Sequence, residues 1–242
     1  MSGSPFTQFE LKPLIDLKLS NVSIAYTNSA LFMTIASILA ISFMFYATRK
    51  VAIIPSRLQC FAEIIYEFIE KTFINTVGKK SLRYFPEVFT TFLFIINCNL
   101  LGILPFSFTV TSHISICFAL AATFFIFITI TGIIINGKHF LKLFMPEGTP
   151  TWLMPIMILI ELFSYLARPI SLAVRLTSNM IAGHVLLKVI ATLVVSTGVI
   201  GSVFAIPLIS ILTGFEIFVA FLQAYIFTIL TCVYLNDALN LH

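Results

Sequence analysis

Residues 171–188 read SLAVRLTSNMIAGHVLLK and carry one arginine, Arg175, in a stretch that is otherwise mostly apolar. A guanidinium keeps its proton at any physiological pH. Placing such a charge at bilayer depth costs about 2.5–3.5 kcal/mol on insertion scales. Intramembrane charges usually serve ion or proton movement, which is the function that Arg175 predicts. The alternative is that Arg175 is paired within the chain and only holds helices together.

The composition indicates a polytopic membrane protein. Of the 242 residues, 59% are hydrophobic and 10% are charged, whereas soluble domains carry about 25% charged residues. The net charge of +4 is too small and too scattered to indicate a nucleic-acid partner. The cysteines have no metal or redox spacing, so we expect buried free thiols and no metal or cofactor. They are Cys60, Cys98, Cys117 and Cys232.

Hydropathy predicts five spans in a single integral membrane domain. Residues 30–48 form the first span, and residues 88–137, which lack Asp, Glu, Lys and Arg, are long enough for two more. Residues 150–237 form a hairpin whose arms each exceed the ~20 residues needed to cross a bilayer. We therefore expect these two long arms to be strongly tilted. The predicted turn region contains Gly198, Gly201 and Pro207.

Residues 55–83 have a different character. Apolar residues recur there at helical spacing, with charged residues between them, which predicts an amphipathic helix in the plane of the inner membrane surface. The basic residues beside the spans all fall on that same side, which places the N-terminus outside and the C-terminus inside. They are Arg49, Lys50, Arg57, Lys138 and Lys142. The expected fold class is an all-α polytopic membrane protein.

Helical geometry gathers polar residues around Arg175. Four of them lie within about 40° of it at 100° per residue. They are Glu161, Arg168, Ser171 and Asn179. These five residues, the polar stripe, extend over about 27 Å at 1.5 Å per residue. An ion pair between Glu161 and Arg168 is an alternative, purely structural use of two of them.

His184 falls on the opposite side of the same helix from Arg175, so it should face a different partner. Glu216 and Gln223 are seven residues apart on the second arm and therefore share a face. A lone buried carboxyl needs a donor, and we expect His184 and Glu216 to meet across the hairpin.

Three segments of the chain resemble subunit a of the F-type ATP synthase. They are RLTSNMIAGH, FEIFVAFLQAYIFTIL and NLLGILPFSFTVTSH, and the resemblance extends from QFELKPLI to YLNDALNLH. The His184 and Glu216 combination is similar to mitochondrial and closely related bacterial members. The chain departs from the family at Thr177 and Ser178, where Phe-Gly or Phe-Ala is usual.

The resemblance implies a stator with two proton half-channels beside a rotating ring of c subunits, with Arg175 essential for proton transfer. The implied outer route contains Asn179, His184, Glu216, Gln223, Asn97 and Asn99. The implied inner route contains Glu161 and Ser171. Implied partners are the c-ring, subunit b of the peripheral stalk, the lipid bilayer and protons. The chain is not expected to be an enzyme alone, and its membrane is the bacterial inner membrane or, alternatively, the mitochondrial inner membrane.

Two other function classes fit the residues less well. A stand-alone channel or secondary transporter would usually show internal repeats, and none is evident. A haem- or quinone-binding subunit would need suitably placed imidazoles. The chain has four histidines, His113, His139, His184 and His242, and only one of them lies well inside a predicted helix pair.

Overall fold

The computed structural model describes residues 13–19, 22–49, 52, 54–104, 107–137, 140 and 153–239, but not the side chains of 13–25, 80 and 193–205. Several residues used above for topology or as candidate haem ligands lie outside this description. They are Lys50, Lys138, His139, Lys142 and His242.

Five helical segments are long and apolar enough to cross a membrane, among the residues described. They are Asn28–Thr48, Ser81–Ile103, Ile114–Asn136, Met154–Thr192 and Ile206–Leu239. The first is helix α1 (Asn28–Thr48), the second contains α3 (Phe85–Ile103), and the third is α4 (Ile114–Asn136). The predicted fold class, an all-α polytopic membrane protein with five spans, is confirmed.

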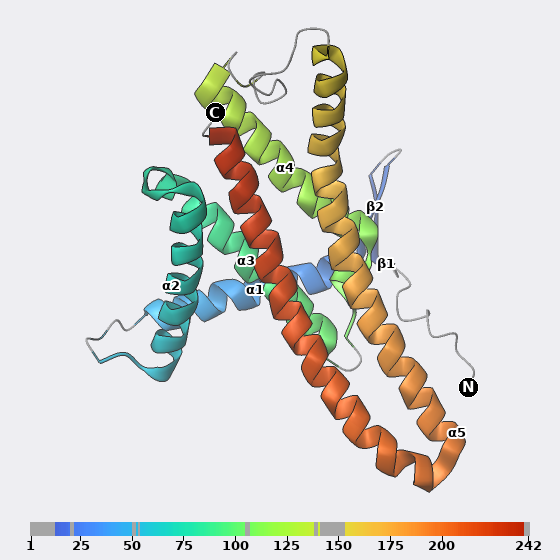
Figure 1. Ribbon diagram of the computed structural model, residues 1–242. Helices are drawn as coiled ribbons and strands as arrows, with labels where there is room; N and C mark the ends of the chain where they lie inside the picture. Colours follow the sequence, from blue (N-terminus) through green and yellow to red (C-terminus); the bar gives the residue numbers. More distant parts are fainter. Residues whose placement is uncertain are drawn as a thin grey trace.

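The last two spans belong to one helix, α5 (Met154–Leu239), which reverses direction between them. Figure 1 shows the two arms running side by side and meeting at a bend. Helical backbone continues through the expected turn, so its glycines and proline mark a helical bend rather than an open loop. A helical bend keeps more backbone hydrogen bonds, which matters where water is scarce. We call Met154–Thr192 the first arm and Ile206–Leu239 the second arm.

The amphipathic segment forms two elements, α2 (Arg57–Val77) and the 3-10 helix η2 (Lys79–Tyr84). Ser56 caps α2 by accepting a hydrogen bond from the Gln59 amide. Gly78 ends it with φ 93°, a left-handed conformation that favours glycine. The apolar face of α2 is buried through Ala62, Ile69, Phe73 and Val77. The in-plane position of this helix stays a prediction.

A two-stranded antiparallel sheet precedes α1 and was not predicted. It pairs β1 (Pro13–Leu19) with β2 (Val22–Thr27). The sequence carried a signal for it, because Ile15, Leu17 and Leu19 alternate with Asp16 and Lys18.

The core lies where α2, α3 and α4 pack against the arms of α5. By contrast, only 11% of the α1 span is buried, and Figure 1 shows α1 lying across the direction of the two arms. If α1 crosses the bilayer upright, the arms are strongly tilted; this tilt stays a prediction. Cys98, Cys117 and Cys232 are buried as free thiols. Cys60 is exposed, contrary to expectation, because it lies off the face that α2 buries.

The predicted topology can be tested by labelling. Thr7→Cys and Lys142→Cys, each in a Cys60→Ser background, should react with an impermeant maleimide from opposite sides of sealed vesicles. The reason is that all five basic residues beside the spans fall on one side of the predicted topology. Reaction of both sites from the same side would contradict it.

Candidate functional site

Arg175 lies on the exposed side of the first arm. The residues next to it in the helix, Leu172, Ala173 and Leu176, are buried against the rest of the molecule. Its own side chain is exposed, and no hydrogen bond or ion pair joins it to any residue that the structure describes. Among the described residues, the alternative in which Arg175 forms an ion pair within the chain is therefore not observed. The guanidinium is left available for a charge on another molecule.

Arg168 has partners on both arms. Its Nη1 donates a hydrogen bond to Asp237 Oδ2 at 3.1 Å. The expected partner, Glu161, is farther away, with its Oε1 at 3.9 Å from Nη2. Asp237 was missed because counting angles along the first arm cannot reveal a residue on the second arm, 69 positions away. The Glu161–Arg168 pair is therefore present, but it is the weaker of the two contacts.

The remaining members of the polar stripe lie at the surface or near it. Ser171 is exposed beside Arg175, and Asn179 is half-buried one turn further along. Ser171 and Arg175 therefore share a face that the hairpin does not cover.

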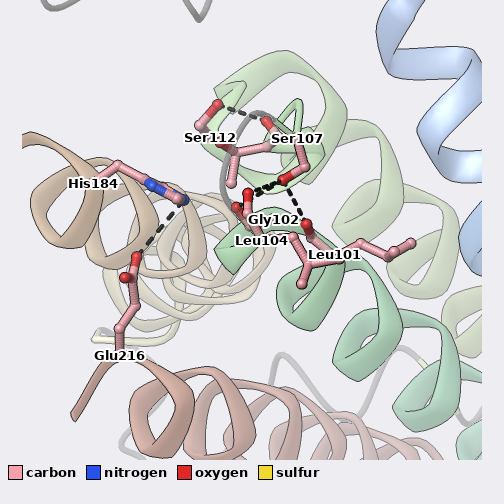
Figure 2. Close-up of polar contacts among 8 residues, drawn as sticks. Leu101, Gly102, Leu104, Ser107, Ser112, His184 and Glu216 are labelled. Atoms are coloured by element: carbon pink, nitrogen blue, oxygen red, sulfur yellow. Dashed lines mark hydrogen bonds and ion pairs between the residues drawn. The ribbon is translucent and has the colours of Figure 1, made fainter. Parts of the chain in front are cut away.

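His184 and Glu216 meet across the hairpin, as expected. His184 Nε2 lies 3.6 Å from Glu216 Oε1, and Figure 2 shows the two side chains pointing toward each other. The distance is longer than a hydrogen bond, so the contact is a close approach of two ionisable groups. Only 6% of the Glu216 side chain is exposed, and neither carboxyl oxygen has a hydrogen-bond partner among the described residues.

Gly183 makes this approach possible. A Cβ atom at position 183 would lie 2.8 Å from Glu216 Oε1 and 3.2 Å from its Cδ. The small residues Ala220 and Ala224 are fully buried on the second arm and allow similar close packing. The two arms thus approach each other closely where the buried acid lies.

The other amides expected at this site behave differently from one another. Asn99 of α3 is fully buried and donates from Nδ2 to the Ala220 carbonyl at 3.2 Å, which joins α3 to the second arm. Gln223 is also buried on that arm. Asn97 instead donates to the Leu93 carbonyl of its own helix at 2.7 Å. The structure therefore brings Asn99 to the second arm and leaves Asn97 turned to its own backbone.

Figure 2 also draws part of a short loop, residues 107–113, which lies between α3 and α4. The Ser107 hydroxyl lies 2.6 and 2.7 Å from the Leu101 and Leu104 carbonyl oxygens, which share its single donor hydrogen. It thereby provides a partner for free carbonyl groups at the C-terminus of α3. The loop packs closely, since a Cβ at Gly102 would lie 2.5 Å from Thr109 Cγ2. The 3-10 helix η3 (Val110–Ser112) follows and is buried.

The sequence did not reveal the polar groups of this loop as part of the site. Thr111 Oγ1 and His113 Nε2 of the loop are buried without a hydrogen-bond partner among the described residues, as are Asn99 Oδ1 and both carboxyl oxygens of Glu216, which the sequence had predicted for the site. Buried polar atoms of this kind are commonly satisfied by internal water. His113, at the start of α4, stacks on Phe108 with ring centres 5.2 Å apart, and burial lowers the pKa of its imidazole.

The arrangement separates three kinds of chemistry along the hairpin. Near the bend lies a buried carboxyl beside an imidazole, with amides and hydroxyls around it. Further along is the exposed, permanent charge of Arg175. At the open end of the hairpin, Arg168 lies between two carboxylates. No cluster of three or more potential metal ligands occurs in the described part of the chain.

The close approach at Gly183 can be tested by thermal stability. Gly183→Ala should lower the midpoint of thermal aggregation in native membranes by about 2–4 °C, because overpacking outweighs the gain in helix propensity. Gly214→Ala is the matched control, since nothing lies within 4 Å of a Cβ there. Equal effects of the two substitutions would contradict the packing described.

The chain also matches a known protein family. A family model described as the ATP synthase A chain matches residues 30–236, which covers the five spans except for two residues at the start of the first and three at the end of the last. This chain belongs to the ATP synthase A chain family.

Proposed function

We propose that this chain is the stator subunit that conducts protons in the membrane sector of an F-type ATP synthase, with two half-channels that lead to the c-ring. Its family makes it a component of the ATP synthase complex in an energy-transducing membrane. The observation that carries the proposal is the exposed guanidinium of Arg175, which has no acid within reach among the described residues. Such a charge is suited to an acid on a moving partner.

Arg175 acts on the carboxyl group of each passing c subunit. A carboxyl that faces lipid must be protonated, because exposing its ionised form costs several kcal/mol. Beside Arg175 the ionised form is favoured, since an opposite charge within about 4–6 Å stabilises it. Each ring carboxyl therefore releases its proton there, and the fixed cation repels protons that would otherwise leak straight through.

The outer half-channel is formed near the bend of the hairpin. His184 and Glu216 face each other there, and the amides of Asn99 and Gln223 are buried on or against the second arm. Asn179 is half-buried on the first arm. Unpartnered buried oxygens support a route in which water and side chains relay protons. Asn97 contributes least, because its amide is bonded to its own helix.

The inner half-channel begins on the other side of Arg175. Ser171 is exposed one turn from it, and Glu161 lies farther toward the open end. The Glu161 carboxylate lies 3.9 Å from Arg168, whose shorter contact is with Asp237. The driving energy is about 2.3 kcal/mol per proton for each 100 mV of membrane potential.

The remaining assignments follow from the proposed role. The c-ring packs on the exposed face that carries Arg175, subunit b of the peripheral stalk holds the chain still, and lipid surrounds the other faces. The proposed location is the bacterial inner membrane, with the mitochondrial inner membrane as the alternative.

The central test is Arg175→Ala. ATP synthesis driven by a proton gradient should be abolished in vesicles while the complex still assembles, because the ring carboxyl loses the cation that favours its ionised form. A passive proton leak is also expected, since the barrier between the half-channels is lost. Val174→Ala is the matched control on the same exposed face. Substantial synthesis by an assembled Arg175→Ala complex, shown by immunoblot, would contradict the mechanism.

Arg175→Lys should fail as well, for a different reason. An ammonium is a compact, strongly hydrated point charge that can lose its proton when buried, and it lacks the planar fork of a guanidinium. The same vesicle assay applies, with synthesis measured per assembled complex. Recovery of near-normal synthesis would show that positive charge alone suffices.

Coupling between His184 and Glu216 can be tested by exchange. The double variant His184→Glu with Glu216→His should retain more proton-driven synthesis than either single variant, because it keeps one acid and one imidazole 3.6 Å apart. A double variant no better than the worse single variant would mean that the two side chains act independently.

A further inference from the structure

Arg168 and Asp237 join the two arms at the open end of the hairpin. Arg168 lies on the first arm, two turns before Arg175, and Asp237 lies near the end of the second arm. The hydrogen bond of 3.1 Å between them is charge-assisted, and Glu161 adds a second carboxylate at 3.9 Å. The side chains of Arg168 and Asp237 are 20% and 35% exposed, so the pair is partly shielded from solvent.

Two tyrosines hold the plane of the Arg168 guanidinium. Its Cζ lies 4.9 Å from the ring centre of Tyr234 on the second arm and 5.4 Å from that of Tyr165 on the first arm. Both distances suit a cation–π contact, which arginine makes with its flat face. Tyr165 is itself fixed, because its hydroxyl is hydrogen-bonded to Thr129 Oγ1 of α4 at 2.7 Å.

α4 also holds the end of the second arm directly. Asn136 Nδ2 donates to the Ala238 carbonyl at 2.6 Å, next to Asp237 in the chain. The helices are in close contact here, since a Cβ at Gly132 would lie 3.1 Å from Ala238 Cβ. The first arm, the second arm and α4 are therefore joined at one place, and Arg168 is the residue that touches both arms.

Arg175 has no comparable attachment. Its exposed side chain forms no hydrogen bond or ion pair with the described residues, although its charge is close enough to Tyr234 to interact with it electrostatically. Its position therefore depends mainly on the backbone of the first arm. That arm contacts the second arm on both sides of Arg175. One contact is Gly183 against Glu216, and the other is Arg168 with Asp237.

We propose that Arg168 and Asp237 form a clasp that positions Arg175, with Asp237 as the counter-ion that holds the clasp closed. This inference rests on the proposed function of Arg175 and adds a positioning role for a residue pair outside the proton path. The two carboxylates around Arg168 also compensate its charge. Arg175 is then the only cation of the polar stripe without a carboxylate beside it. Each ring carboxyl therefore meets a single unpaired positive charge on this helix.

The test is Asp237→Asn in the complete ATP synthase, with synthesis measured in vesicles per assembled complex. We expect the rate to fall about tenfold with the KM for ADP unchanged, since displacements near 1 Å in a reacting geometry cost up to about a hundredfold. A purely structural loss would instead lower the amount of complex and leave the rate per complex unchanged. Glu87→Gln is the control, an exposed carboxylate without an ion pair among the described residues.

Exchange of the pair separates positioning from direct proton transfer. Arg168→Asp with Asp237→Arg restores an ion pair between the arms but moves the carboxylate to the first arm. We expect the double variant to recover most of the rate lost in Asp237→Asn. A double variant no better than the worse single variant would overturn the clasp, as would an Asp237→Asn rate within about twofold of the unmodified complex.

A more conservative substitution, Arg168→Lys, tests the clasp if the Asp237→Asn complex fails to assemble. Arg168→Lys keeps the charge but loses the planar fork and the ring contacts, so we expect synthesis per complex to fall about threefold. An unchanged rate would overturn the clasp. If Asp237→Asn is normal while Arg175→Ala is inactive, only the clasp fails; if assembled Arg175→Ala is active, the proposed function fails.

Discussion

A guanidinium that cannot lose its proton has to be placed in a segment that crosses lipid, and much of this structure follows from that constraint. Ordinarily such a charge is paired or led to the membrane surface. Here Arg175 is left exposed on the first arm without an acid among the described residues, while Arg168, two turns away, has two. The two arginines differ in environment rather than in chemistry, and that difference supports the separate roles proposed for them.

Because Arg175 has no ion pair to hold it, its position depends on how firmly the first arm packs against the second. This packing comes from close helix contacts that small residues permit, at Gly183, Ala220 and Ala224. At the same place Glu216 is buried beside His184, with carboxyl oxygens that no described residue satisfies. Tight packing and unsatisfied polar atoms thus coexist at the bend end of the hairpin. This combination suits a narrow path for water and protons better than it suits a purely structural core.

The sequence reading succeeded where a single helix carries the information. Hydropathy identified five spans, and angles along the first arm correctly placed His184 on a different side from Arg175. It failed for contacts between distant segments. Asp237 was overlooked as the closer partner of Arg168, and the polar groups of the 107–113 loop were not recognised. The different bonding of Asn97 and Asn99 was also not foreseen, and the role of Asn97 stays a prediction. The β-hairpin was a different kind of miss, because its alternating pattern was visible.

The sequence alone determined that the chain lies in a lipid bilayer, how many times it spans that bilayer, and that it carries a permanent charge within it. These properties depend on residue type and helical period. Only the tertiary structure decided which charges are compensated. The Arg168–Asp237 and His184–Glu216 contacts depend on how two arms pack over a bend, and no local periodicity encodes that register. Arg175 could be recognised from its surroundings in sequence, but its freedom from an internal partner is a property of the folded hairpin.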